Sequence, residues 1–201
     1  MMRVIGSLFI ALLLLNTSPL YAKKKASAPA VAPDSDVIPK QQRKGFFFRL
    51  AAGAGFAKTK YNKHDLDAAS LPLEISIGSG IVENFALHAT VFATCGFAPQ
   101  KDTTSFCLSA FGLGTTYYIM PQNVFFSLIL GLGRETATGN TQPFESSNIG
   151  FAMRALVGKE WWVSHAWSLG LAGAFTFGTF DNSGYTNNHF SGGLLFSATY
   201  N

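Results

Sequence analysis

The end of the chain alternates between two kinds of side chain. Apolar residues fall on one parity, Phe190, Leu194, Phe196, Ala198 and Tyr200, and small or polar residues fall on the other, Ser191, Gly193, Ser197 and Thr199. A period of two predicts a β-strand with one face toward lipid or an apolar core. About eight segments share this pattern, so the sequence predicts an all-β fold.

The start of the chain has the pattern of an export signal. A basic start at Arg3 precedes an apolar stretch from Val4 to Leu15, and a small residue, Ala22, stands before Lys23. This order is typical of a secretory signal peptide. The apolar stretch is shorter than the roughly 20 residues that a membrane-spanning helix needs. We therefore predict that residues 1–22 are a signal peptide cleaved after Ala22.

Charged residues make up 13% of the chain, about half of the roughly 25% usual in soluble domains. Aromatic residues reach 14%, yet no later apolar run is long enough for a spanning helix. A barrel with a lipid-facing exterior and a polar interior accounts for both facts. A soluble periplasmic β-sandwich or a lipocalin-like barrel is the alternative.

A basic segment separates the signal from the first expected strand. Residues 23–44 are rich in Ala, Pro and Ser and carry a cluster of positive charges: Lys23, Lys24, Lys25, Lys40, Arg43 and Lys44. This composition predicts a disordered, solvated periplasmic linker. In an exported chain so short a basic tract is a poor argument for nucleic-acid binding, so no nucleic-acid partner is expected.

Eight alternating segments follow between Gly45 and the C-terminus, the first at residues 45–57. Short turns are expected at 82–84, 120–123 and 162–165, and longer polar loops at 58–70, 98–104, 135–147 and 179–188. Short turns that alternate with longer loops are typical of outer-membrane barrels, with the turns in the periplasm. Aromatic side chains are expected at the membrane interfaces: Trp161, Trp162, Trp167, Tyr117 and Tyr200. A tryptophan cluster in a soluble core is the alternative for the three tryptophans.

In this pattern, residues 45–201 resemble the small outer-membrane β-barrel superfamily of OmpA-like and OmpX-like barrels. The resemblance implies an eight-stranded, antiparallel, up-and-down transmembrane barrel in the outer membrane of a Gram-negative-type bacterium. It also implies contact with outer-membrane lipid and recognition of the last strand by the barrel-assembly machinery. Here Tyr200 is penultimate, whereas that signal usually closes on an aromatic residue. No peptidoglycan-binding domain of the kind that OmpA-like proteins carry is expected.

Cys95 and Cys107 flank a hairpin centred near Lys101, which places them opposite each other. Directly opposed Cβ atoms lie about 4.5–5.5 Å apart, and an exported protein meets an oxidising compartment. We therefore expect a Cys95–Cys107 disulfide, with two free thiols as the alternative.

Five ionisable side chains fall on the inward parity of the expected strands: Arg49, Glu74, His88, Arg154 and Glu160. Unpaired buried charges are costly, so these groups are expected to pair, as Arg154–Glu74 and Arg49–Glu160. An eight-stranded barrel is just wide enough for its own side chains. The network then plugs the lumen or, alternatively, gates a narrow path for water or small solutes by exchanging partners.

One motif raises the possibility of an enzyme. His189 and Ser191 have the His-x-Ser spacing found in some outer-membrane deacylases, and Asp181 lies in the preceding loop. A nucleophilic serine needs a base and an acid that orients it, and here no acid follows His189. The pair also lies on the inward parity, away from lipid. We predict a non-enzymatic barrel with a structural or surface-exposed role, without cofactor, nucleotide or metal; a narrow channel is the alternative and a lipid-modifying enzyme a more distant one.

Overall fold

The structure is a computed structural model that describes residues 43–61, 64–97, 105–138, 145–182 and 185–201. The expected signal peptide, most of the expected linker and the expected loop at 98–104 lie outside the described residues.

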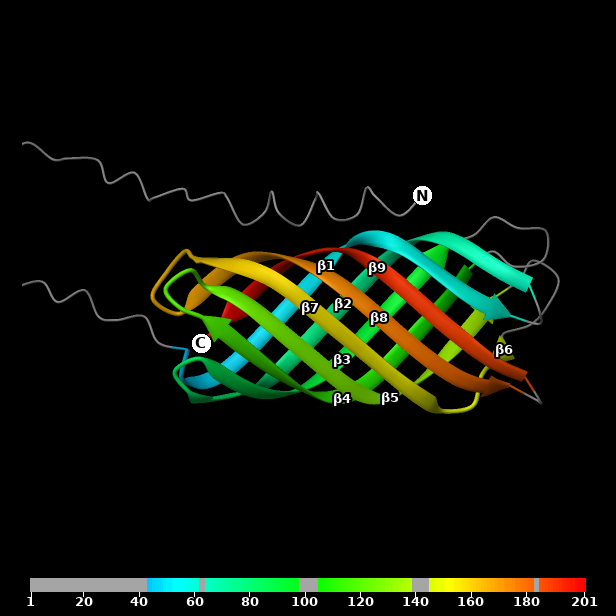
Figure 1. Ribbon diagram of the computed structural model, residues 1–201, viewed down its shortest axis with the longest axis horizontal. Coiled ribbons are helices and arrows are strands. Elements are labelled where there is room, and N and C mark those ends of the chain that lie inside the picture. The colour runs from blue at the N-terminus through cyan, green and yellow to red at the C-terminus, as the bar shows by residue number, and fades with distance from the viewer. Residues whose placement is uncertain (1–42, 62–63, 98–104, 139–144, 183–184) are drawn as a thin grey trace, which may run out of the picture. The chain divides into compact units, whose positions relative to one another are not determined.

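The described chain forms a closed antiparallel β-barrel (Figure 1). Its elements are β1 (Gly45–Tyr61), β2 (His64–Val82), β3 (Phe85–Phe97), β4 (Ser105–Ile119), β5 (Val124–Thr138), β6 (Glu145–Ser146), β7 (Gly150–Trp162), β8 (Trp167–Asn182) and β9 (Tyr185–Tyr200). Each long strand pairs with its neighbour in sequence, and β1 pairs with β9 to close the barrel. The predicted eight-stranded up-and-down barrel is therefore confirmed.

The short element β6 belongs to the same wall position as β7. Both pair with β5. The element β6 pairs with residues 136–137 of β5, and β7 pairs with residues 124–133 of β5. Between them Ser147 keeps contact with β5, because its Oγ accepts a hydrogen bond from the Glu135 amide at 2.9 Å. Eight wall positions therefore hold nine strand elements.

Side chains alternate across the wall as the sequence pattern predicts. Outward positions expose large apolar side chains on every long strand, for example Leu50, Ile77, Val91, Leu113 and Leu128. The intervening positions are buried inside the barrel. The wall therefore separates an apolar exterior from an interior that holds the polar side chains.

Several strands run farther than the sequence predicted. The expected loop at 58–70 is wrong, since β1 continues to Tyr61 and β2 begins at His64. Alternation persists there with lysines outside in place of apolar residues, and Lys58 forms ion pairs with Asp65 and Asp67 at 3.5 and 3.7 Å. Pairs of opposite charge on neighbouring strands stabilise a β-sheet, so β1 and β2 can continue here without apolar outward side chains. The expected loops at 135–147 and 179–188 are likewise partly strand.

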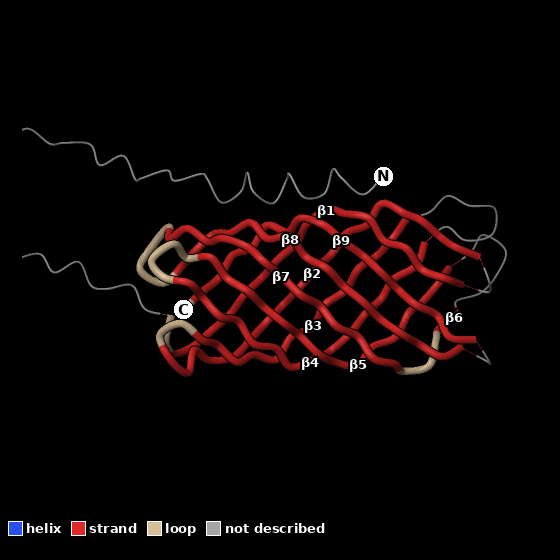
Figure 2. The backbone as a smooth tube through the Cα atoms, viewed as in Figure 1, coloured by secondary structure: helices blue, strands red, loops and turns tan. Residues whose placement is uncertain are grey.

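The three short turns all lie at one end of the barrel, which we call the turn end (Figure 2). They connect β2 to β3, β4 to β5 and β7 to β8, at the positions predicted from the sequence. The backbone before β1 and the C-terminus lie at the same end, because Phe48 is paired with Tyr200. Asn123 in the second turn has a φ of 58°, a left-handed conformation that asparagine adopts more readily than most residues.

One interruption breaks the ladder between β1 and β2. Ala52 pairs with Leu73 and Gly55 with Ser70, but the two positions between them are unpaired. Pro72 occupies one of these positions and has no N–H to donate. The break lies beside the middle of the lumen network described below.

Candidate functional site

The barrel interior contains charged side chains along much of its length. Three arginines are fully buried (Arg43, Arg49 and Arg154), and three glutamates are buried with them (Glu74, Glu135 and Glu160). Two histidines, His88 and His189, are also buried. Burial of this many ionisable groups is tolerated only where they are paired or hydrogen-bonded, so their contacts define the site.

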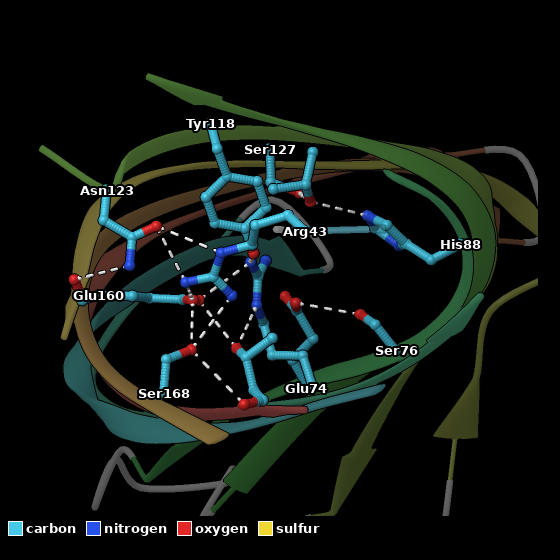
Figure 3. Close-up of polar contacts among 12 residues, drawn as sticks. Arg43, Glu74, Ser76, His88, Tyr118, Asn123, Ser127, Glu160 and Ser168 are labelled. Atoms are coloured by element: carbon cyan, nitrogen blue, oxygen red, sulfur yellow. Dashed lines mark hydrogen bonds and ion pairs between the residues drawn. The ribbon is translucent and has the colours of Figure 1, made fainter. Parts of the chain in front are cut away.

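Glu160 on β7 is the acceptor around which the turn-end part of the network is built (Figure 3). One carboxylate oxygen lies 2.6 Å from Nη2 of Arg43, and the other lies 3.2 Å from Nη2 of Arg49. The same two oxygens accept hydrogen bonds of 2.8 Å from the hydroxyls of Ser168 and Thr199. One carboxylate thus joins two arginines to β8 and β9.

The position of Arg43 corrects the sequence analysis, which placed it in a solvated basic linker. Its side chain is fully buried in the turn end of the lumen. The guanidinium donates to Oδ1 of Asn123 at 3.0 and 3.2 Å and to Oγ of Ser168 at 3.1 Å. It also lies over the rings of Tyr118 and Trp162, 4.1 and 4.3 Å from their centroids. These partners satisfy the cation away from water, whereas the neighbouring Lys44 is exposed.

Arg49 lies next to this cluster. Besides Glu160, it donates to the Tyr118 hydroxyl at 2.7 Å and to Oγ1 of Thr199 at 3.2 Å, and it lies over the Phe125 ring. The expected Arg49–Glu160 contact is therefore part of a larger group that includes Arg43.

Arg154 crosses the lumen from β7 to the opposite wall. Its Nη1 lies 3.7 Å from Glu74 Oε2, and Ser76 donates to the other oxygen of Glu74 at 3.3 Å. The guanidinium donates four hydrogen bonds of 2.8–3.0 Å, to the hydroxyls of Thr94 and Thr176 and to the carbonyls of Leu73 and Ala93. Leu73 follows Pro72 in β2, so Arg154 braces the wall beside the ladder interruption.

His88 lies inside the barrel, as its parity predicts, but its partners are hydroxyls. Its ring nitrogens lie 2.7 Å from Thr90 Oγ1 and 3.0 Å from Thr116 Oγ1, and the ring stacks on Phe47. No ion pair of His88 occurs among the contacts of the described residues. It extends the network through the hydroxyls of Thr90 and Thr116.

The pair of Glu135 and His189 was missed by the sequence analysis. Nδ1 of His189 lies 2.9 Å from Oε1 of Glu135, and Thr59 donates to Oε2 at 2.8 Å. Extending the β5 alternation through Gly131 and Gly133 would have placed Glu135 inward. The structure pairs His189 with Glu135 rather than Asp181, which accepts a hydrogen bond from Thr186.

Cys95 and Cys107 are directly opposed on β3 and β4 and form a disulfide in the structure. The bond closes the end of the hairpin opposite the turn end. For a 12-residue separation, loop entropy predicts a contribution of about 3 kcal/mol to the free energy of unfolding.

Replacing both cysteines with serine is therefore expected to lower the free energy of unfolding by about 3 kcal/mol. Urea titration of the refolded barrel measures this loss, and reduction of the native protein with dithiothreitol should reproduce it. Equal stability of the native and double-serine proteins would contradict the expectation.

The predicted interface aromatics occupy two different surfaces. Trp161, Trp167 and Tyr117 are exposed on the exterior, where Trp167 packs edge-on against Tyr200. Trp162 has the opposite parity, and its ring lies against Arg43 inside the mouth. The alternation along β7 accounts for the difference, since neighbouring residues point to opposite faces.

Within the described ranges no cluster of three or more His, Cys, Asp and Glu side chains could hold a metal ion. In the same ranges no helix is long and apolar enough to cross a membrane.

An apolar exterior around a closed wall and a hydrogen-bonded polar interior define the class of small membrane β-barrels. Among solved structures, Neisserial surface protein A (NspA) is similar to this chain, with a TM-score of 0.53 and 17% identity over 78% of this chain and 99% of that one. Ail of Yersinia pestis gives a TM-score of 0.48 and 11% identity, over 76% and 99% of the two chains. OprG from Pseudomonas aeruginosa gives 0.43 and 11%, over 80% and 97%.

No protein-family model matches the chain, and no curated protein matches its sequence. The likeness to NspA shows a shared fold: the chain has the fold of a small outer-membrane barrel.

Proposed function

We propose that this protein is a non-enzymatic outer-membrane β-barrel whose lumen is closed by its charged network and whose role in the envelope is structural or surface-exposed. The observation that carries the proposal is the set of three fully buried arginines, each held by acceptors on more than one strand. Side chains tied across the lumen in this way fill an eight-stranded barrel and cross-brace its wall.

The first test is electrophoresis of outer membranes with and without heating. A closed barrel resists detergent until heated, so a heat-dependent mobility shift is expected for protein recovered in the outer-membrane fraction. Recovery in the soluble periplasmic fraction without a shift would contradict a membrane role. The purified barrel in planar bilayers should then show no steady conductance, because the network fills the lumen.

Residues 1–22 are proposed to direct export and to be removed, and residues 23–42 to form a linker in the periplasm. The turn end would then face the periplasm, and the opposite end the exterior of the cell. The apolar exterior would contact outer-membrane lipid, and β9 would be the strand that the barrel-assembly machinery recognises.

A narrow channel for water or small solutes is a second candidate, favoured by one observation. Nη1 of Arg49 and Oε2 of Glu74 are buried and lack hydrogen-bond partners within the described part of the chain. A donor and an acceptor with unused hydrogen-bonding capacity can take up alternative partners. Steady single-channel currents in the native protein would support this candidate against a sealed lumen.

A lipid-modifying enzyme remains the least supported candidate. His189 and Ser191 are both buried inside the barrel, away from the lipid-facing surface. Unchanged lipid A in cells that overexpress the protein would exclude this activity, and modified lipid A would overturn the non-enzymatic proposal.

A further inference from the structure

The surroundings of Arg43 form a defined box at the turn end of the lumen. Asn123, Glu160 and Ser168 supply the oxygen acceptors around the edge of the guanidinium. These acceptors are themselves positioned by protein contacts. Asn123 Nδ2 donates to the Glu160 carbonyl at 3.1 Å, and Ser168 donates to the Glu160 carboxylate at 2.8 Å. The edge of the box is therefore built by the barrel itself.

The faces of the box are aromatic. The Tyr118 and Trp162 rings both lie within 4.5 Å of the guanidinium carbon of Arg43, measured to the ring centroids. A planar, weakly hydrated cation gains from such rings as well as from the carboxylate. A carboxylate and an amide at the edge with aromatic rings on the faces match a guanidinium better than an ammonium.

Arg43 is separate from the wall that forms the box. It stands before β1, whereas Tyr118, Asn123, Glu160, Trp162 and Ser168 lie on β4, β7, β8 or the turn before β5. The box is therefore formed by residues of the barrel wall and of one turn, and Arg43, which precedes the first strand, occupies it.

Two glycines allow the backbone to bring Arg43 to the mouth. Gly45 has a φ of 101°, which only glycine adopts readily, and it turns the chain at the start of β1. A Cβ on Gly80 would lie 2.3 Å from the Arg43 carbonyl oxygen, so the two backbones approach closely only because residue 80 is glycine. Backbone geometry and side-chain contacts thus both direct Arg43 into the box.

We propose that the turn-end mouth of this barrel is a guanidinium-binding site, occupied by the protein's own Arg43 and able to take an alkylguanidinium in its place. The ligand class is a guanidinium group on a flexible alkyl chain, which is also the chemistry of an arginine side chain. The proposal concerns molecular recognition at the mouth and is independent of the cellular location of the barrel.

The test uses the full mature chain refolded in detergent micelles, with Arg43 replaced by alanine. Because Arg43 lies outside the strand ladder, Arg43→Ala should keep the heat-dependent mobility shift. Titration with N-propylguanidinium is followed by tryptophan fluorescence, to which Trp162 contributes, and by melting temperature. We expect a saturable fluorescence change and a rise in melting temperature, with half-saturation at about 1–10 mM for a ligand of this size.

A second compound and three control proteins test whether the response comes from the Arg43 box. N-propylammonium at the same concentrations should have no saturable effect, since it lacks the planar fork and the weak hydration. The native protein and Lys44→Ala, which changes the exposed neighbour, should not respond, because Arg43 fills the box in both. Adding Glu160→Gln to Arg43→Ala should abolish the response.

Equal responses to the two compounds, a response of the native protein, or no saturable response of Arg43→Ala would each overturn the proposal. Arg43→Lys serves if Arg43→Ala does not fold, since it keeps the positive charge. N-propylguanidinium should displace the lysine with a weaker but saturable response, and the absence of that response would overturn the proposal.

Discussion

Replacing Glu160 with alanine is expected to lower the free energy of unfolding by about 3–5 kcal/mol, because it leaves the positive charges of Arg43 and Arg49 buried without their carboxylate. Both guanidinium groups are fully buried and within 3.2 Å of the Glu160 oxygens. Urea titration of the refolded barrel, followed by tryptophan fluorescence, measures the change.

Asp67→Ala is the matched control for Glu160→Ala. Asp67 is also an acid in an ion pair, with Lys58 at 3.7 Å, but both side chains are largely exposed. Exposed pairs contribute about 0–1 kcal/mol, so this variant should unfold at nearly the native urea concentration. Equal small effects of the two substitutions would show that the lumen charges are solvated and would contradict the described network.

The second large effect is expected for Arg154→Ala. The substitution removes four hydrogen bonds that link β7 to β2, β3 and β8, and it leaves Glu74 without its ion-pair partner. The expected loss is again about 3–5 kcal/mol, measured by the same urea titration. Arg134→Ala, which changes an exposed arginine of β5, is the control and should cost less than about 0.5 kcal/mol.

A second substitution separates charge from packing at this position. Adding Glu74→Gln to Arg154→Ala removes the uncompensated charge, so the double variant should regain part of the lost stability. A plugged structural lumen predicts unchanged, near-zero conductance in Arg154→Ala. New steady currents in this variant would support the gate.

The barrel could be predicted from the sequence because the membrane and the lumen demand opposite chemistry on the two faces of each strand. The sequence therefore alternates between outward apolar and inward charged residues, as at Leu50 and Arg49 or at Ile75 and Glu74. Inward parity and the need to pair buried charges were also enough to predict that Arg154 pairs with Glu74. The ends of the strands were less predictable. Beyond the segment with apolar outward side chains, β1 and β2 continue with lysines and aspartates, and this composition is typical of a loop.

Arg43 could not be found in the same way. It precedes the first strand, so it has no parity, and its basic neighbours suggest a solvated segment. Its acceptors Asn123 and Ser168 lie 80 and 125 residues farther along the chain. Only the folded barrel brings these residues together, so no local sequence pattern can predict their contact.

The separation between Arg43 and its acceptors also has a consequence for the order of assembly. Arg43 emerges early in synthesis, but the carboxylate, amide and hydroxyl that hold it belong to strands and turns made much later. Its place exists only after β7 and β8 have joined the wall. Burial of Arg43 therefore depends on strands that are made long after it, although Arg43 precedes the first strand in sequence.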